Sequence, residues 1–150
     1  MPRWTETFYM SPSVEQRPVV FDVIPSDKVG EVWAVVVDKI GDALERSGGR
    51  FLPEDVRENL EAGNMQLWVA YDGTVKAVIV TEILIFPRLK ALSVFLVTGE
   101  DRKSWIANVE KLEEFGRLHG CVIIEAWARP GWQRVLKDWA RTHILLEKPL

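Results

Sequence analysis

The chain has 150 residues, 47% of them hydrophobic, which is enough to bury one core but short for two domains. A formal net charge of −3 argues against a broad nucleic-acid or anionic-membrane surface, because such surfaces need clustered Lys and Arg. The single cysteine, Cys121, excludes an intramolecular disulfide.

Residues 1–18 are predicted to form an extended arm ahead of one domain that spans residues 19–150. Three prolines deny the arm a regular helix, and Trp4, Phe8 and Tyr9 need a surface on which to lie. Two alternatives are open for these aromatic side chains: packing on the chain's own domain, or contact with a partner or a second subunit. Residues 1–16 are polar with scattered aromatics rather than a basic end followed by an apolar stretch, and no uncharged run reaches about 18 residues, so we expect an unexported, cytoplasmic protein.

The first part of the domain predicts a strand followed by two helices. Residues 19–24 are a short β-branched run, and Ser26 suits the N-cap of a helix whose apolar spacing continues until residues 47–49. Pro53 suits the first position of a second helix, and Gly63 suits its end.

The middle of the domain predicts three antiparallel strands in a meander. Residues 65–71 form the first strand, and Asp72-Gly73 is the strongest hairpin signal in the chain. The return strand covers residues 74–86, and the third strand is centred on residues 92–97.

After the third strand, a helix is expected over residues 101–118, with Thr98 and Asp101 resembling a capping box. The apolar residues of this helix recur at helical spacing on one face: Trp105, Val109, Leu112 and Phe115. A strand at 121–128, a short helix at 130–139 and a last strand at 142–148 follow. The predicted fold is a single α/β (α+β) domain with a mixed, mostly antiparallel sheet, helices on both faces and the order β-α-α-β-β-β-α-β-α-β.

This order of elements resembles the GNAT superfamily of N-acetyltransferases, over residues 19–148. The segments 120–126 (GCVIIEA), 129–132 (RPGW) and 134–137 (RVLK) resemble the small GNAT-like proteins of phage and prophage genomes. The resemblance implies direct transfer of an acetyl group from acetyl-CoA to an amine. It also implies that the cofactor lies where the strands at 92–97 and 121–128 splay apart.

The same resemblance implies which residues hold the cofactor. Pantetheine would bind the backbone of Leu96, Val97, Thr98 and Gly99, and the pyrophosphate would bind Arg102, Lys103 and Ser104. Two features depart from the family pattern. The turn at residues 100–105 contains no glycine, and residues 131–140 contain no Tyr, which many members use as the general acid.

Two carboxylates are candidates for the base that takes a proton from the amine. Glu82 is the only acid in residues 75–86, and Glu125 is the only acid in residues 122–128. Glu82 ranks first because it interrupts the longer apolar run, although each side chain has the alternative of facing solvent. The resemblance places the acceptor near Trp127, Arg129 and Trp132, for which stacked packing is the alternative role.

Two functions from different classes remain open. The first is an acetyl-CoA-dependent N-acetyltransferase that acts on an amine-bearing small molecule or protein in the cytoplasm. The second is a noncatalytic GNAT-fold assembly or binding component, for example of a virion, attached through residues 1–18. No spacing of His, Cys and acidic residues indicates a metal site.

Overall fold

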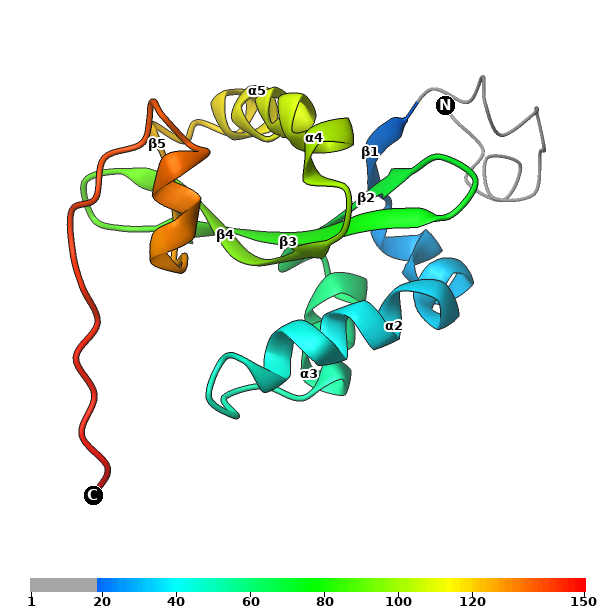
Figure 1. Ribbon diagram of the computed structural model, residues 1–150, viewed down its shortest axis with the longest axis horizontal. Helices are drawn as coiled ribbons and strands as arrows, with labels where there is room; N and C mark the ends of the chain where they lie inside the picture. Colours follow the sequence, from blue (N-terminus) through cyan, green and yellow to red (C-terminus); the bar gives the residue numbers. More distant parts are fainter. Residues whose placement is uncertain (1–18) are drawn as a thin grey trace.

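A computed structural model describes residues 19–150 of the chain (Figure 1). The arm predicted for residues 1–18 lies outside the described residues, so neither alternative for its aromatic side chains is decided. Within the described part of the chain, no helix is both long and apolar enough to cross a membrane.

Five strands form one mixed sheet, in the spatial order β1-β2-β3-β4-β5. The strands are β1 (Val20–Ile24), β2 (Met65–Tyr71), β3 (Val75–Ile85), β4 (Lys90–Gly99) and β5 (Ile123–Ala126). The first four are antiparallel to their neighbours, whereas β5 runs parallel to β4. The predicted single α/β domain with a mixed, mostly antiparallel sheet is confirmed.

Helices cover both faces of the sheet, as predicted (Figure 1). One face, here called the α2 face, carries the 3-10 turn η2 (Ser26–Lys28), α2 (Val29–Glu45) and α3 (Pro53–Glu61). The other, the α5 face, carries α4 (Arg102–Trp105), the 3-10 turn η3 (Ile106–Val109) and α5 (Glu110–Leu118). A further 3-10 turn, η4 (Pro130–Arg134), follows β5.

The core consists of two apolar layers, one on each face of the sheet. On the α2 face, Val36 and Ile40 of α2 pack with Leu67 and Val80 from the strands. These helical residues keep the spacing that predicted α2. The expected N-cap at Ser26 is wrong, because Ser26 lies inside η2 and α2 begins at Val29.

A short chain of polar contacts crosses the second layer. The Trp68 indole N–H donates to the Thr81 hydroxyl at 3.0 Å, and that hydroxyl donates to the Gln66 side-chain oxygen at 2.8 Å. Thr81 is fully buried among the apolar residues of the α5 face. Each buried polar group is therefore satisfied, which removes the cost of placing it there.

The helix expected over residues 101–118 is divided into α4, η3 and α5. Trp105 ends α4 with a φ of −129°, outside the helical range, while its indole N–H donates to the Glu100 carbonyl at 2.9 Å. The expected capping box is also wrong. Asp101 is itself the N-cap residue, with a left-handed φ of 48° and no side-chain capping bond.

The C-terminal region has less regular structure than its sequence predicts. The helix expected at 130–139 is only the 3-10 turn η4, and the strand expected at 142–148 does not form. A strand needs a neighbour with which to exchange backbone hydrogen bonds. Residues 142–150 instead run away from the sheet in extended form (Figure 1).

Candidate functional site

A one-residue bulge interrupts β4 in the middle of the sheet. Val80 of β3 pairs with Leu96, but the next residue, Thr81, pairs with Val94, so Phe95 is extra. Phe95 and Leu96 both pack into the apolar layer of the α2 face, although adjacent strand residues normally point to opposite faces. A bulge bends its strand and increases the local twist.

The parallel pairing of β4 with β5 ends at this bulge. β5 pairs with β4 only from Ala91 to Val94, and Phe95 is the next residue. From Phe95 to Gly99, the outer edge of β4 has no strand partner within residues 19–150. This stretch holds the backbone of Leu96, Val97, Thr98 and Gly99, so the site predicted for pantetheine coincides with unpaired strand edge.

The two candidate carboxylates lie in one row across the sheet. Ser93 of β4 pairs with Glu82 of β3 on one side and with Glu125 of β5 on the other. Paired residues point to the same face, with neighbouring Cβ atoms about 5 Å apart. Glu82, Ser93 and Glu125 therefore share the α2 face, two residues before the bulge.

The surroundings of Glu82 favour it as a proton acceptor. Burial raises the pKa of the Glu82 carboxyl above its ordinary value of 4.5, since a partly buried site disfavours the charged form. A carboxylate with a raised pKa holds a proton more tightly and is a stronger base.

Ser93 was not among the residues predicted from sequence. It is only 6% exposed, and together with Thr81 it is one of two buried polar residues in the described chain. Its signal in the sequence is a single hydroxyl inside the apolar segment Ala91–Phe95. That signal has meaning only once the register places Ser93 between two glutamates.

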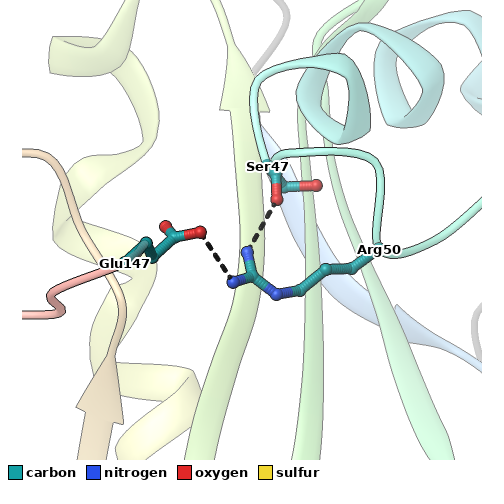
Figure 2. A network of polar contacts seen from close by, with 3 residues as sticks. All are labelled: Ser47, Arg50 and Glu147. Atoms are coloured by element: carbon teal, nitrogen blue, oxygen red, sulfur yellow. Dashed lines mark hydrogen bonds and ion pairs between the residues drawn. The ribbon is translucent and has the colours of Figure 1, made fainter. Parts of the chain in front are cut away.

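The loop between α2 and α3 covers the bulge on the α2 face. The Phe51 ring packs edge-on against the Phe95 ring, with 4.8 Å between centroids. In the same loop, Arg50 donates to the Ser47 carbonyl at 3.1 Å and forms an ion pair with Glu147 at 3.2 Å (Figure 2). Arg50 and Glu147, far apart in the sequence, thus meet at the loop that also packs on Phe95.

Close packing against β3 fixes the turn that follows β4. A Cβ added at Gly99 would lie 2.5 Å from the Lys76 carbonyl oxygen, and the Glu100 N–H donates to that oxygen at 2.8 Å. Glycine at position 99 therefore has a packing function whether or not a cofactor binds there.

The three residues predicted to bind pyrophosphate begin the divided helix. Arg102 and Lys103 are exposed, and the Ser104 hydroxyl donates to the Asp101 carbonyl at 2.8 Å. α4 is a single turn of four residues, so it has a weaker dipole than the long helix that was expected. Attraction for an anion at this turn therefore depends mainly on the two cationic side chains.

The residues predicted to contact the acceptor differ in exposure, although the Trp132 backbone N–H donates to the Arg129 carbonyl at 3.0 Å. Trp132 of η4 is partly buried, and its ring lies beneath the Arg102 guanidinium, 5.8 Å from the centroid to the guanidinium carbon. Trp127 is 74% exposed, and Arg129 is exposed as well. The structure thus brings Trp132 to a predicted cofactor residue, and it leaves Trp127 and Arg129 on the surface.

Two hollows in the described chain lie on the opposite face of the sheet. One, of about 100 Å³, is lined by Leu112 of α5, Ile124 of β5 and Cys121 between these two elements, among others. The other, of about 240 Å³, lies between Trp68 and Lys111. Neither is lined by Glu82 or Ser93, so the carboxylate row belongs to a different surface.

Several solved structures with the same architecture are described as acetyltransferases. An aminoglycoside acetyltransferase from an uncultured soil metagenomic sample, in complex with sisomicin, superposes with a TM-score of 0.65 at 8% identity, covering 88% of this chain and 96% of that chain. The ribosomal-protein-alanine N-acetyltransferase of Brucella melitensis biovar Abortus gives 0.61 at 14% identity, covering 88% and 97%. A GNAT family acetyltransferase of Staphylococcus aureus gives 0.59 at 10% identity, covering 89% and 99%.

These likenesses concern the fold, because all three identities are low. No protein-family model matches the sequence, and no curated protein matches it. The chain has the GNAT fold: a mixed sheet whose fourth and fifth strands part at a bulge, between two layers of helices.

Proposed function

We propose that this protein is an acetyl-CoA-dependent N-acetyltransferase that transfers an acetyl group directly to an amine. The observation that carries the proposal is the coincidence at Phe95. There the bulge and the end of the β5 pairing leave strand edge open, two residues from a row that holds two carboxylates. An acyl transfer to an amine needs the acyl donor and a base held in one place.

In this proposal, the backbone of Leu96–Gly99 binds the pantetheine of acetyl-CoA. The unpaired edge of β4 offers peptide groups to such a ligand, as it would to another strand. Arg102, Lys103 and Ser104 bind the pyrophosphate. Charge-assisted bonds from the two exposed cations compensate for the short helix α4. When bound, acetyl-CoA supplies the acetyl group as a thioester.

Glu82 is the proposed base, and Glu125 is the second candidate. An amine is protonated near neutral pH and must lose a proton before it can attack a thioester. The raised pKa of Glu82 brings its basicity closer to neutral pH. Ser93 lies between the two carboxylates in the same row.

The acceptor class is an amine on a small molecule or a protein. The support comes from solved neighbours described as an aminoglycoside acetyltransferase and a ribosomal-protein-alanine N-acetyltransferase. Trp127, Arg129 and Trp132 are the proposed acceptor contacts. The motifs in residues 120–137 add a phage or prophage type to the proposal. The solved neighbours do not favour the rival role as a noncatalytic assembly component.

Calorimetric titration of the full chain with acetyl-CoA tests the cofactor step. We expect saturable binding, weakened by about 1–3 kcal/mol when Arg102 and Lys103 are both replaced by Ala. Arg117→Ala, which removes an exposed cation on α5, is the matched control and should bind as the parent does. Absence of binding by the parent would overturn the proposed function. Unchanged affinity in the double variant would overturn the pyrophosphate assignment alone.

A further inference from the structure

The C-terminal arm, defined here as residues 142–150, has the composition of a strand but pairs with no strand of residues 19–150. Residues 142–148 read THILLEK, and the side chains of Ile144 and Leu146 are 62% and 83% exposed. Three consecutive large aliphatic residues, 144–146, thus lie in solvent in extended form. A soluble domain rarely leaves such a run uncovered.

The arm is directed away from the body of its own chain. Figure 1 shows it running from the β5 end of the sheet past the edge of the helical layer, with the C-terminus clear of both. The Arg50–Glu147 ion pair ties it to the α2–α3 loop (Figure 2). Both partners are more than half exposed, so the pair sets the arm's direction but adds little stability.

The same chain also has an open sheet edge, on β5. Within residues 19–150, β5 pairs only with β4, so its outer edge has no backbone partner. Three large side chains around it, Val122, Ile123 and Trp127, are exposed. The opposite edge of the sheet differs, because the Lys111 ammonium donates to the Phe21 carbonyl of β1 at 2.7 Å.

We propose that the C-terminal arm of one copy pairs as a strand with the outer edge of β5 in a second copy. Within residues 19–150, the arm is an unpaired strand-like segment and β5 has an unpaired outer edge, so a reciprocal exchange about a two-fold axis would pair the two. The arm stays where its own chain holds it, and the second copy's β5 comes alongside.

The exchange also bears on the carboxylate row. Glu125 of β5 is the last member of the row. Among residues 19–150, no strand pairs with β5 on the side away from β4. A strand from the second copy would place a partner residue beside Glu125 on the α2 face. Dimer formation through the arm does not require that the protein transfers acetyl groups.

Sedimentation equilibrium of the full chain over a range of concentrations is the first test. We expect the parent to be a dimer, and the double variant I144D/L146D to raise the dimer dissociation constant by roughly 10²-fold or more. Leu118→Asp is the matched control, because Leu118 on α5 is 85% exposed and lies outside the arm. It should remain as dimeric as the parent.

The double variant is expected to unfold cooperatively as a folded monomer, since the side chains of Ile144 and Leu146 are mostly exposed in their own chain. A parent that is monomeric at every concentration would overturn the proposal. A double variant that still dimerises like the parent would overturn it too.

Disulfide trapping tests which edge receives the arm. Two variants are made in a Cys121→Ala background, one with I123C on β5 and I144C, the other with I123C and L145C. Residues 144 and 145 point to opposite sides of an extended arm, so the two variants sample both of its faces. We expect one of them to form a covalent dimer under oxidation, whereas neither single cysteine alone does so to the same extent. A disulfide within one monomer would show that the arm folds onto its own β5 and would overturn the exchange. An intact dimer with no cross-link from either chain would overturn the β5 assignment.

Discussion

The guanidinium of Arg102 lies over the indole ring of Trp132, 5.8 Å from the ring centroid. This contact joins the first turn after β4 to the 3-10 turn after β5, across the opening between the two strands. The resemblance to the GNAT superfamily implies different subsites for the two residues, the cofactor for Arg102 and the acceptor for Trp132. Their contact makes the position of Arg102 depend on Trp132.

The first prediction is that Trp132→Ala weakens acetyl-CoA binding indirectly. Removing the ring frees the Arg102 side chain, and a contact of this kind at an exposed site is worth about 0.5–1 kcal/mol. Titration should therefore show a smaller loss of acetyl-CoA affinity for Trp132→Ala than for Arg102→Ala. A variant that carries both changes should lose little affinity beyond that lost by Arg102→Ala alone. Trp132→Phe keeps a ring and should recover part of the affinity. Strictly additive losses would show that the two side chains act separately.

The second prediction concerns the role of Glu82 as base. Glu82→Gln should lower turnover by roughly 10²-fold or more while cofactor affinity stays unchanged. In the parent, the rate should fall as the pH drops through the pKa of Glu82, which burial raises above 4.5. The variant should lack that limb of the pH profile. Glu125→Gln is the comparison. If Glu125 is the base, Glu125→Gln rather than Glu82→Gln should lower turnover and lack that limb of the pH profile.

The third prediction needs no substrate, because the same pKa shift affects folding. The folded state holds the Glu82 proton more tightly than the unfolded chain, whose pKa stays near 4.5. Stability should therefore fall as the pH rises from about 4.5 through the raised pKa, and it should remain lower above it. Urea unfolding should show Glu82→Gln to be more stable than the parent at neutral pH, with the difference vanishing at low pH. A constant difference at all pH values would contradict this.

The fourth prediction is that Gly99→Ala destabilises the fold by about 1–3 kcal/mol, the usual cost of forcing atoms into a packed site. The new Cβ would lie 2.5 Å from the Lys76 carbonyl oxygen and 2.7 Å from the Ala77 Cα, both backbone atoms of β3. Gly131→Ala is the control, since a Cβ there meets no atom within 4 Å. Thermal or urea unfolding measures both. Equal stability of the two variants would mean that β4 moves away from β3 freely.

The fifth prediction separates shape from hydrogen bonding at the buried Thr81. Thr81→Val keeps the shape but leaves the Trp68 indole N–H without its acceptor, which should cost about 1–3 kcal/mol. Thr81→Ser keeps the hydroxyl and should lose less. Unfolding measurements that rank the two variants the other way would show that the methyl group matters more than the hydrogen bonds.

Local chemistry was enough to predict most of the fold. Asp72-Gly73 predicted the hairpin, and Gly73 takes the positive φ of 96° that such a turn needs. Pro53 begins α3, and Gly63 follows its end with a φ of 80°. In each case, the residue itself favours the conformation, so no knowledge of distant parts of the chain is required.

Features set by tertiary contacts were not predictable in this way. The division of the helix at Trp105 accompanies the bond from its indole N–H to the Glu100 carbonyl, which leaves no signal in the spacing of apolar residues. The row of Glu82, Ser93 and Glu125 depends on the register of three strands. The expected strand at 142–148, within the C-terminal arm, has the composition of a strand, but composition does not reveal whether a neighbouring strand is present.

The bulge at Phe95 also decides what a change of chain length would do. Ser93 points to the α2 face, Val94 to the α5 face, Leu96 to the α2 face and Val97 to the α5 face. Without Phe95, these four residues would alternate regularly, and each would keep its present face. β4 would become an uninterrupted ladder, free to continue along β5 beyond Val94. The single extra residue at position 95 therefore separates a sheet whose β4–β5 pairing stops at Val94 from one in which that pairing could continue.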